Sequence, residues 1–364
     1  MVRPPIPVAH ALGTYPVYVD GGALTRLPEM LTGLWGERRL AIITDTHVAV
    51  LYDKWAQVNV VRAEATLIFP AGEESKTRVT WGRLSDELLA RGFGRDSAIV
   101  AIGGGVVGDV AGFVAATYCR GVPYAQVPTT LLAMLDASVG GKVGVDTPQG
   151  KNLIGAFHPP AIVVSDPATL MDLPEAEYRA GFAEAIKHGV IADAKYFDWI
   201  ETNVSGLIAR SRETLVDLIR RSVEIKAEVV SADERESGRR AILNAGHTIA
   251  HALETESGFQ LAHGEAVALG LIAETRIAEQ MGIAPAGLSA RIASLAAALG
   301  LPTELQSRRD LTRLTQALTR DKKNRGGKIH QALPKDLGKM HVANGQWTVP
   351  VDSTLIMEVL VQRS

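Results

Sequence analysis

The chain has 364 residues, of which 46% are hydrophobic, enough for two packed domains. Its 38 basic and 40 acidic side chains give a formal net charge of −2, which excludes a general attraction to nucleic acid or to an anionic membrane. The single cysteine, Cys119, excludes an internal disulfide, and the prolines near the start of the chain do not suit a signal peptide, so we expect a soluble, cytoplasmic protein.

Short β-rich runs alternate with helical segments in the first half of the chain, which is typical of a layered α/β domain. Residues 15–20 (YPVYVD) and 39–45 (RLAIITD) predict strands. Residues 97–105 (SAIVAIGGG) are apolar and end in glycines, which is typical of a buried parallel strand leading into a turn. Residues 106–118 (VVGDVAGFVAATY) then predict the helix that follows.

Residues 157–174, which contain several prolines, separate this half from a region of long helical patterns. Spacing typical of helices covers residues 175–191, 212–233, 247–257 and 263–282. Strand-like residues 327–334 and 339–350 and a helix over 353–362 follow. We therefore predict an α/β domain over 1–165 and a mainly helical domain over 166–364.

The glycines at 103–105 stand between a predicted strand and a predicted helix, where backbone amides can approach a phosphate closely. A glycine-rich turn without a ligand is the alternative. Asp45 ends another predicted strand, where a carboxylate can accept hydrogen bonds from ribose hydroxyls, or can equally cap a helix.

Two further segments carry charges. Glu73 and Lys76 lie on a glycine-led turn (70–76, PAGEESK) and, taken singly, are typical of solvated surface charges. Residues 126–152 combine threonines, Asp136 and two lysines with many glycines. This pattern indicates either a loop that handles anions, with Lys142 and Lys151 binding phosphate, or a flexible surface loop.

The helical half contains a candidate metal site. Glu184 and Lys187 are three apart on one helical face, either as an exposed ion pair or as a buried carboxylate that needs a cation. His247 and His251 share another helical face, and His263 opens the next helix. Imidazoles with a carboxylate are the ligands of a catalytic zinc-type site, but a packed helix with two polar residues is equally compatible.

Two basic features are compatible with an anionic substrate. Arg240 and Asn244 are predicted at the start of the helix that carries His247 and could hold a carboxylate. The basic run over 320–328 is either a solvated loop or a segment that closes over an anion.

Nine ordered segments together resemble the 3-dehydroquinate synthase family, and the resemblance extends from about residue 40 to 330. They are 72–76 (GEESK), 91–96 (RGFGRD), 102–109 (IGGGVVGD), 120–145 (RGVPYAQVPTTLLAMLDASVGGKVGV), 150–160 (GKNLIGAFHPP), 181–189 (GFAEAIKHG), 243–254 (LNAGHTIAHALE), 263–270 (HGEAVALG) and 321–328 (DKKNRGGK).

The resemblance implies a Rossmann-like NAD-binding domain, a helical domain that binds Zn²⁺ or Co²⁺, and a homodimer to which the partner contributes Arg120. The implied substrate is 3-deoxy-D-arabino-heptulosonate 7-phosphate, and the products are 3-dehydroquinate and phosphate. The implied sequence is alcohol oxidation by NAD, β-elimination of phosphate, reduction by the same NADH, ring opening and aldol closure.

The resemblance also implies roles for individual residues. The metal ligands are Glu184, His247 and His263, and the candidate catalytic residues are Asp136, Lys142, Lys187 and His251. Phosphate is assigned to Arg120, Lys142, Asn152, His251 and Lys323, favoured over Lys322. The substrate carboxylate is assigned to Lys226, Arg240 and Asn244, and its hydroxyls to Asp136 and Lys187. NAD is assigned to Asp45, Glu73, Lys76, Gly104, Gly105, Asp109, Thr129, Thr130, Lys142, Lys151, Thr169 and Asp172.

The chain departs from the family pattern at four positions. His47 replaces a usual asparagine, Asp172 a threonine, Ala245 a phenylalanine and Ala250 a glycine. The first two affect the predicted contacts with the cofactor, and the last two affect packing beside the histidines.

Three other functions compete with this prediction. Related sugar phosphate cyclases act on substrates without a carboxylate, which would leave the cations of the predicted carboxylate set unpaired. A metal-dependent polyol dehydrogenase would release NADH and would give Arg120, Lys142 and Asn152 no phosphate to bind. A non-catalytic binding protein would not need this complete set of acid, metal and phosphate residues.

Overall fold

A computed structural model of the protein describes residues 3–56, 61, 63–305, 311–320 and 329–361. It divides into two compact units. The α/β unit comprises Met1–Leu173 with Leu215–Ala227, and the helical unit comprises Pro174–Thr214 with Glu228–Ser364. The change of unit at 173/174 falls a few residues after the predicted boundary at 165/166, and the extent of each domain stays a prediction.

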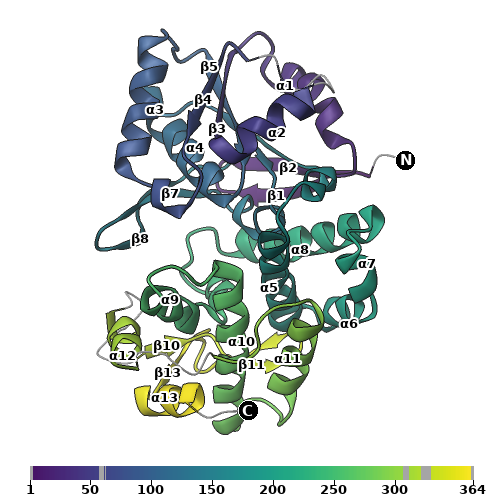
Figure 1. Ribbon diagram of the computed structural model, residues 1–364, viewed down its shortest axis with the longest axis vertical. Coiled ribbons are helices and arrows are strands. Elements are labelled where there is room, and N and C mark those ends of the chain that lie inside the picture. Colours follow the sequence, from purple (N-terminus) through teal and green to yellow (C-terminus); the bar gives the residue numbers. More distant parts are fainter. Residues whose placement is uncertain (1–2, 57–60, 62, 306–310, 321–328, 362–364) are drawn as a thin grey trace. The chain divides into compact units, whose positions relative to one another are not determined.

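The α/β unit is built on a seven-stranded sheet with the order β1-β2-β9-β6-β5-β3-β4 (Figure 1). β1 and β2 pair antiparallel, and every other neighbouring pair is parallel. The strands are β1 (Ile6–His10), β2 (Gly13–Val19), β3 (Arg39–Asp45), β4 (Ala65–Phe69), β5 (Ser97–Gly103), β6 (Tyr124–Pro128) and β9 (Ile162–Ser165).

Helices cover both faces of this sheet because alternate residues of its central strands point to opposite sides. On β3, Ile42 packs in one core with residues of α1 (Leu27–Trp35) and with Val48 of α2 (Thr46–Ala56). Ile43 packs in the other core with residues of α3 (Arg78–Ala90) and α4 (Gly105–Thr117). Every residue of β5 is buried, as its unbroken apolar run predicts.

One expectation for this unit is wrong, and one of its strands was not predicted. The loop predicted over 126–152 contains a turn of π-helix, η4 (Ala133–Ala137), and a hairpin of β7 (Lys142–Thr147) and β8 (Gly150–Phe157), in which Gly144 faces Gly155. Without side chains at these facing positions the two backbones approach closely, so the glycines indicate strand pairing here and not a loop. The proline-containing segment 157–174 includes β9, a fully buried strand inside the sheet.

The helical unit contains long helices that begin where the sequence predicts them. Its helices are α5 (Glu175–Ala192), α6 (Ala194–Thr202), α7 (Val204–Ile208), α8 (Arg212–Ala232, whose middle belongs to the α/β unit), α9 (His247–Glu256), α10 (His263–Gln280), α11 (Leu288–Ala298), α12 (Leu311–Arg320) and α13 (Ser353–Val361). Among the described helices, none has both the length and the apolar character needed to cross a membrane.

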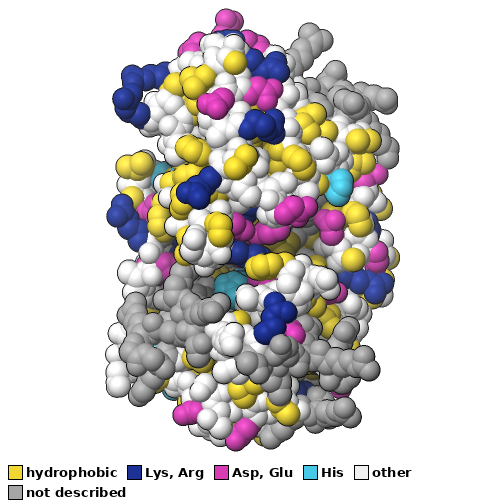
Figure 2. Space-filling view, turned by 60° about the vertical axis from the view of Figure 1, so that its left-hand side comes forward, with side chains coloured by type: hydrophobic (Ala, Val, Ile, Leu, Met, Phe, Trp, Pro, Cys, Tyr) yellow, Lys and Arg dark blue, Asp and Glu magenta, His cyan; other side chains and the backbone are white. Residues whose placement is uncertain are grey.

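α5 and α10 form the centre of the helical unit. Residues 180–191 of α5 are buried on all sides, which is typical of a helix inside a core. α10 packs against α5, α9, α11 and α13. Short strands in the described part of this unit form two pairs, β10 (Ile329–Gln331) with β13 (Val349–Val351) and β11 (Pro334–Asp336) with β12 (Lys339–Met340). On the face in Figure 2, acidic and basic side chains are interspersed, in keeping with the small net charge.

Candidate functional site

The chain changes its direction across the sheet between the neighbouring strands β3 and β5. β4 lies beyond β3 on one side, whereas β6 and β9 follow β5 on the other. Open α/β sheets bind ligands outside the carboxyl ends of the strands at such a point. Here those ends are Asp45 and Gly103, and the first turn of α4, starting at Gly105, has no side-chain cap. Its amides therefore suit an anionic ligand.

Asp45 caps α2. Its Oδ1 atom accepts hydrogen bonds from the backbone amides of His47 and Val48, both at 2.9 Å. The helix-cap interpretation of Asp45 is thus confirmed. Both bonds use the same oxygen, so the cap leaves Oδ2 for a ribose hydroxyl, a contact that stays a prediction.

Lys76 is buried and forms an ion pair with Asp109, with Nζ 2.6 Å from Oδ2. The interpretation of Lys76 as a solvated surface charge is therefore wrong. Burial lowers the pKa of Lys76, but Asp109 and Glu73 outweigh that effect and raise it above its usual value. Glu73 contacts Lys151 at 3.4 Å, so the structure brings these four predicted cofactor residues into one charged cluster.

The threonines after β6 adjoin the glycine turn after β5. The Thr129 amide donates to the Gly103 carbonyl at 3.0 Å, and a Cβ atom on Gly104 would lie 3.0 Å from Thr130 Cγ2. A side chain at Gly104 would therefore crowd the turn. Thr169 lies in the short helix η5 (Pro167–Met171) after β9, and Asp172 ends that helix at the same edge of the sheet.

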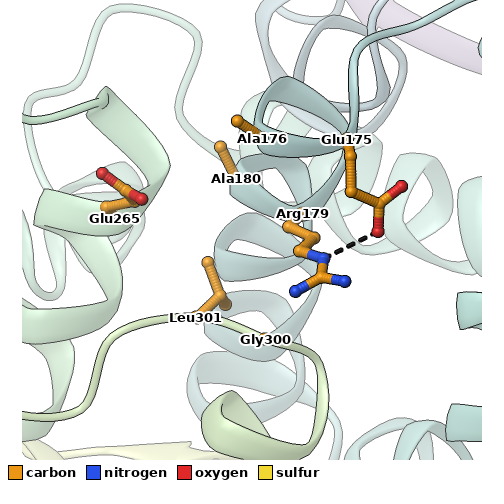
Figure 3. Close-up of a pocket in the computed structure, with 7 residues that line it drawn as sticks. All are labelled: Glu175, Ala176, Arg179, Ala180, Glu265, Gly300 and Leu301. Carbon is orange, nitrogen blue, oxygen red and sulfur yellow. Dashed lines mark hydrogen bonds and ion pairs between the residues drawn. The ribbon is translucent and has the colours of Figure 1, made fainter.

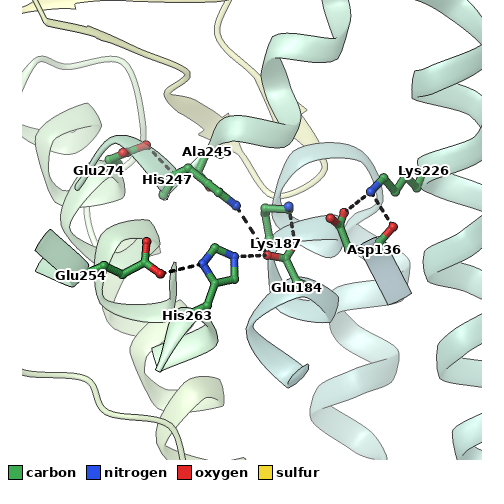
Figure 4. A network of polar contacts seen from close by, with 10 residues as sticks. Asp136, Glu184, Lys187, Lys226, Ala245, His247, Glu254, His263 and Glu274 are labelled. Atoms are coloured by element: carbon green, nitrogen blue, oxygen red, sulfur yellow. Dashed lines mark hydrogen bonds and ion pairs between the residues drawn. The ribbon is translucent and has the colours of Figure 1, made fainter. Parts of the chain in front are cut away.

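Asp136 and Lys226 pair with each other inside the α/β unit. Lys226 Nζ lies 2.9 Å from Asp136 Oδ1 and donates to the Asp136 carbonyl at 2.6 Å (Figure 4). Lys226 is only 6% exposed, so its buried charge needs a partner such as Asp136.

The predicted phosphate residues of the α/β unit are exposed. Lys142 begins β7, Asn152 lies in β8, and Arg120 ends the short helix η3 (Tyr118–Arg120). Arg120 and Asn152 have φ of 67° and 54°, and such backbone conformations in residues other than glycine cluster at functional sites. The backbone amide of Asn152 donates a hydrogen bond to Asp146 Oδ1 at 2.7 Å, which holds the backbone in this conformation.

Glu184, His247 and His263 form a cluster in the helical unit whose possible ligand atoms all lie within 4.8 Å of one another. Glu184 lies on α5, and the two histidines begin α9 and α10. Their Nε2 atoms face Glu184 Oε1 at 3.7 and 3.9 Å (Figure 4). Each Nδ1 atom has its own acceptor, the Ala245 carbonyl at 3.2 Å and Glu254 Oε1 at 3.3 Å. This leaves the Nε2 lone pairs for a cation, so the residues fit a metal ion.

Lys187 contacts the other oxygen of Glu184, and both side chains are 1% exposed. The pair is therefore a buried carboxylate with a cation, and the interpretation as an exposed ion pair is wrong. The small and apolar residues around the pair, from Ala180 to Ile186, are buried with it.

His251 lies one turn after His247, and the rings meet edge to face at 5.6 Å. The metal-competent cluster contains His263 and Glu184 but not His251. The geometry separates two histidines that their spacing alone left equivalent.

Arg240 and Asn244 were predicted at the start of the helix that carries His247, and this prediction is wrong. They belong to a separate short helix, η6 (Arg239–Asn244), which Gly246 at φ 81° separates from α9. Asn244 Nδ2 donates to Glu236 Oε1 at 2.5 Å. The preceding turn is held by Asp233: burial raises the pKa of this carboxyl, but the amides of Arg240, Ser237 and Gly238 donate to it and together lower it.

Some features were not predicted, and one prediction cannot be placed. The buried carboxylate of Glu254, on α9, contacts the start of α10, and that of Glu274, on α10, contacts the start of α9. No local sequence pattern identifies these two residues, because each acts on a different helix from its own.

A cavity of about 330 Å³ in the helical unit contains none of the predicted site residues. It is lined by Glu175, Ala176, Arg179, Ala180, Glu265, Gly300 and Leu301 (Figure 3). Lys323 lies outside the described residues.

Comparison with solved structures supports the fold. A 2-deoxy-scyllo-inosose synthase complexed with carbaglucose-6-phosphate, NAD⁺ and Co²⁺ has a TM-score of 0.89 at 29% identity, covering 98% of this chain and 99% of that one. ValA, a 2-epi-5-epi-valiolone synthase from Streptomyces hygroscopicus subsp. jinggangensis 5008 with NAD⁺ and Zn²⁺ bound, has a TM-score of 0.85 at 28% identity, covering 97% of each chain.

Comparison with families and curated relatives is more specific. The family descriptions "3-dehydroquinate synthase N-terminal" and "3-dehydroquinate synthase C-terminal" match residues 66–180 and 181–324. The 3-dehydroquinate synthase of Symbiobacterium thermophilum is 47% identical over 333 residues, covering 90% of this chain and 93% of the relative. That of Caulobacter vibrioides is 44% identical over 348 residues, covering 93% and 94%. With both halves matched and relatives this similar along most of its length, the chain belongs to the 3-dehydroquinate synthase family.

Proposed function

We propose that this protein is a 3-dehydroquinate synthase, a phosphate-eliminating lyase that converts 3-deoxy-D-arabino-heptulosonate 7-phosphate to 3-dehydroquinate and phosphate. The observation that carries the proposal is the convergence of Glu184, His247 and His263 in a chain of this family. Relatives at 40–47% identity carry this name, whereas the inosose and valiolone synthases are 28–29% identical.

NAD and a divalent metal are the proposed cofactors. NAD would supply a reversible hydride acceptor, and the metal, Zn²⁺ or Co²⁺, would supply a Lewis acid for substrate oxygens. The similar solved structures of the inosose and valiolone synthases contain NAD⁺ with Co²⁺ and with Zn²⁺, respectively, which supports this combination of cofactors. The proposed NAD residues are Asp45, Glu73, Lys76, Gly104, Gly105, Asp109, Thr129, Thr130, Lys142, Lys151, Thr169 and Asp172, and the metal residues are Glu184, His247 and His263.

Lys187 is the residue best placed to move a proton beside the metal ligands. Its ammonium group contacts Glu184, and a buried lysine can exchange a proton when a neighbouring charge changes. Asp136 and Lys226 form a second acid and base pair. We propose that Asp136 and Lys187 bind substrate hydroxyls, and that Asp136, Lys142, Lys187 and His251 are the catalytic residues.

Phosphate and carboxylate groups of the substrate have separate proposed partners. Arg120, Lys142, Asn152, His251 and Lys323 are proposed to bind the phosphate, and Lys226, Arg240 and Asn244 the carboxylate. The exposure of Arg120 and Lys142 suits a ligand that brings its own charge. The proposed protein is a homodimer in which the exposed Arg120 acts on the partner's substrate. The single cysteine supports a cytoplasmic location.

The pairing of Lys226 with Asp136 removes one reason for excluding the other sugar phosphate cyclases. A substrate without a carboxylate was expected to leave Lys226 unpaired, but Lys226 has Asp136 as its partner in this structure. The higher identity to 3-dehydroquinate synthases therefore carries this distinction. A metal-dependent polyol dehydrogenase is the remaining alternative.

Phosphate release tests the proposal. The metal-loaded protein, given the heptulosonate and a trace of NAD, should release one phosphate per substrate without a lasting rise in NADH absorbance. A chelator or omission of NAD should stop the release. NADH formed in proportion to substrate would favour the dehydrogenase, and turnover of a sugar phosphate without a carboxylate in place of the heptulosonate would favour another sugar phosphate cyclase.

A further inference from the structure

The two helices that begin with metal-competent histidines each send a buried carboxylate to the other. α9 begins at His247 and carries Glu254, which is 3% exposed. α10 begins at His263 and carries Glu274, which is 0% exposed. Neither carboxylate belongs to the set Glu184, His247 and His263, so burying their charges needs another physical reason.

Glu254 contacts the ring of His263. Its Oε1 atom lies 3.3 Å from Nδ1, the nitrogen on the side of the ring away from Glu184 (Figure 4). A carboxylate there requires Nδ1 to carry the proton, which leaves the Nε2 lone pair toward Glu184. It also fixes the ring's orientation and makes it a stronger donor to a cation.

Glu274 contacts the start of α9. Its Oε2 atom accepts from the Gly246 amide at 2.7 Å, and its Oε1 atom accepts from the Ile249 amide at 3.3 Å. These amides lie on either side of His247 in the chain. A negative charge at a helix N-terminus also interacts favourably with the helix dipole. Glu274 thereby fixes the backbone that carries His247, whose Nδ1 is held by the Ala245 carbonyl.

The close approach of the two helices makes this exchange possible. A Cβ atom on Gly270 of α10 would lie 2.0 Å from the Gly246 carbonyl oxygen, so only glycine allows this contact. Glu274 is one helical turn beyond Gly270, which places its side chain at the first amides of α9.

We infer that Glu254 and Glu274 are positioning residues of the metal site, each fixing the histidine at the start of the other's helix. This inference rests on the proposed metal site and extends it to two residues outside the ligand set. Loss of a hydrogen-bonded partner of a metal-binding histidine typically weakens metal affinity by about 10–100-fold. We expect that range for Glu254→Gln, which retains size and removes the charge.

Zn²⁺ affinity of the full chain, measured by competition with a chromogenic chelator, tests the inference without any assay of turnover. Glu254→Gln should weaken Zn²⁺ binding about 10–100-fold, and Glu274→Gln should also weaken it. Glu279→Gln is the matched control, because Glu279 lies on α10 too but accepts from Ser289 at the start of α11, at 2.7 and 2.9 Å. This variant should bind Zn²⁺ like the unaltered chain.

Circular dichroism and thermal melting of the metal-free proteins separate positioning from folding. A merely structural role would lower the melting temperature of Glu254→Gln and leave the Zn²⁺ affinity of the folded protein unchanged, and that result would overturn the inference. Should Glu254→Gln not fold, Glu254→Asp replaces it, because this change withdraws the carboxylate from His263 by one methylene. Zn²⁺ binding that is several-fold weaker in Glu254→Asp supports the inference, and unchanged Zn²⁺ affinity overturns it. Failure of the unaltered chain to bind Zn²⁺ or Co²⁺ would instead overturn the proposed metal dependence.

Discussion

Glu184 has different neighbours on its two oxygen atoms. Oε2 contacts Lys187, and Oε1 faces the Nε2 atoms of His247 and His263. A buried carboxylate with a single cation balances its charge, but it also needs groups that satisfy its remaining lone pairs. A metal ion at Oε1 would meet that need, and Lys187 would then hold the carboxylate in place from the other side.

This arrangement separates the roles of two histidines on one helix. His247→Ala removes a proposed ligand, so Zn²⁺ affinity should fall by more than the roughly 10–100-fold expected for an outer partner. His251→Ala should retain the metal, and its turnover should fall by about 10²–10⁴-fold if it transfers a proton. Metal content by mass spectrometry and phosphate release check the two effects separately. Loss of metal from His251→Ala would contradict the division of roles.

The partners of individual side chains were hard to predict. The sequence predicts Glu184 and His263 as site residues, but the pairing of Lys76 with Asp109 and of Lys226 with Asp136 joins segments far apart in the chain. Such contacts depend on strand order and helix packing, which spacing along one element does not report. The same reason explains why Glu254 and Glu274 were not predicted.

At the scale of elements, helix starts were predicted well and sheet membership less so. The starts of α5, α8, α9 and α10 agree with the predictions because apolar spacing is sustained over several turns. The strand β9 was missed because only four residues, Ile162–Ser165, stand among prolines. The hairpin of β7 and β8 was missed because its glycines, which allow close strand pairing, are also typical of loops.

The contact between α9 and α10 predicts a strong effect of one methyl group. In Gly270→Ala the new Cβ atom would lie 2.0 Å from the Gly246 carbonyl oxygen, so the helices must separate. Overpacking of this kind should lower the free energy of unfolding by about 1–3 kcal/mol, measured in urea. Gly82→Ala in α3 is the control, since its Cβ meets nothing within 4 Å; it should raise stability by up to about 1 kcal/mol. Equal effects of the two changes would contradict the proposed packing.

At the scale of the whole molecule, each unit has its own proposed ligand. The α/β unit contains the strand ends, the glycine turn and the Lys76–Asp109 pair, and the helical unit contains the metal-competent cluster. The change of unit at 173/174 lies close to the boundary between the two family matches at 180/181. A ligand that binds only the folded state stabilises the structure that contacts it.

The two ligands should therefore protect different segments from hydrogen exchange. At about 100 times its dissociation constant, each ligand should add about 2.7 kcal/mol to the stability of the structure it binds. Zn²⁺ should slow amide exchange in α9 and α10, whereas NAD should slow it at the end of β5 and the first turn of α4. In His247→Ala the Zn²⁺ protection should disappear and the NAD protection should remain. In metal-free protein, NAD could instead slow exchange in α9 and α10 and leave β5 and α4 unaffected. This result would contradict the assignment of NAD to the α/β unit and of the metal alone to the helical unit.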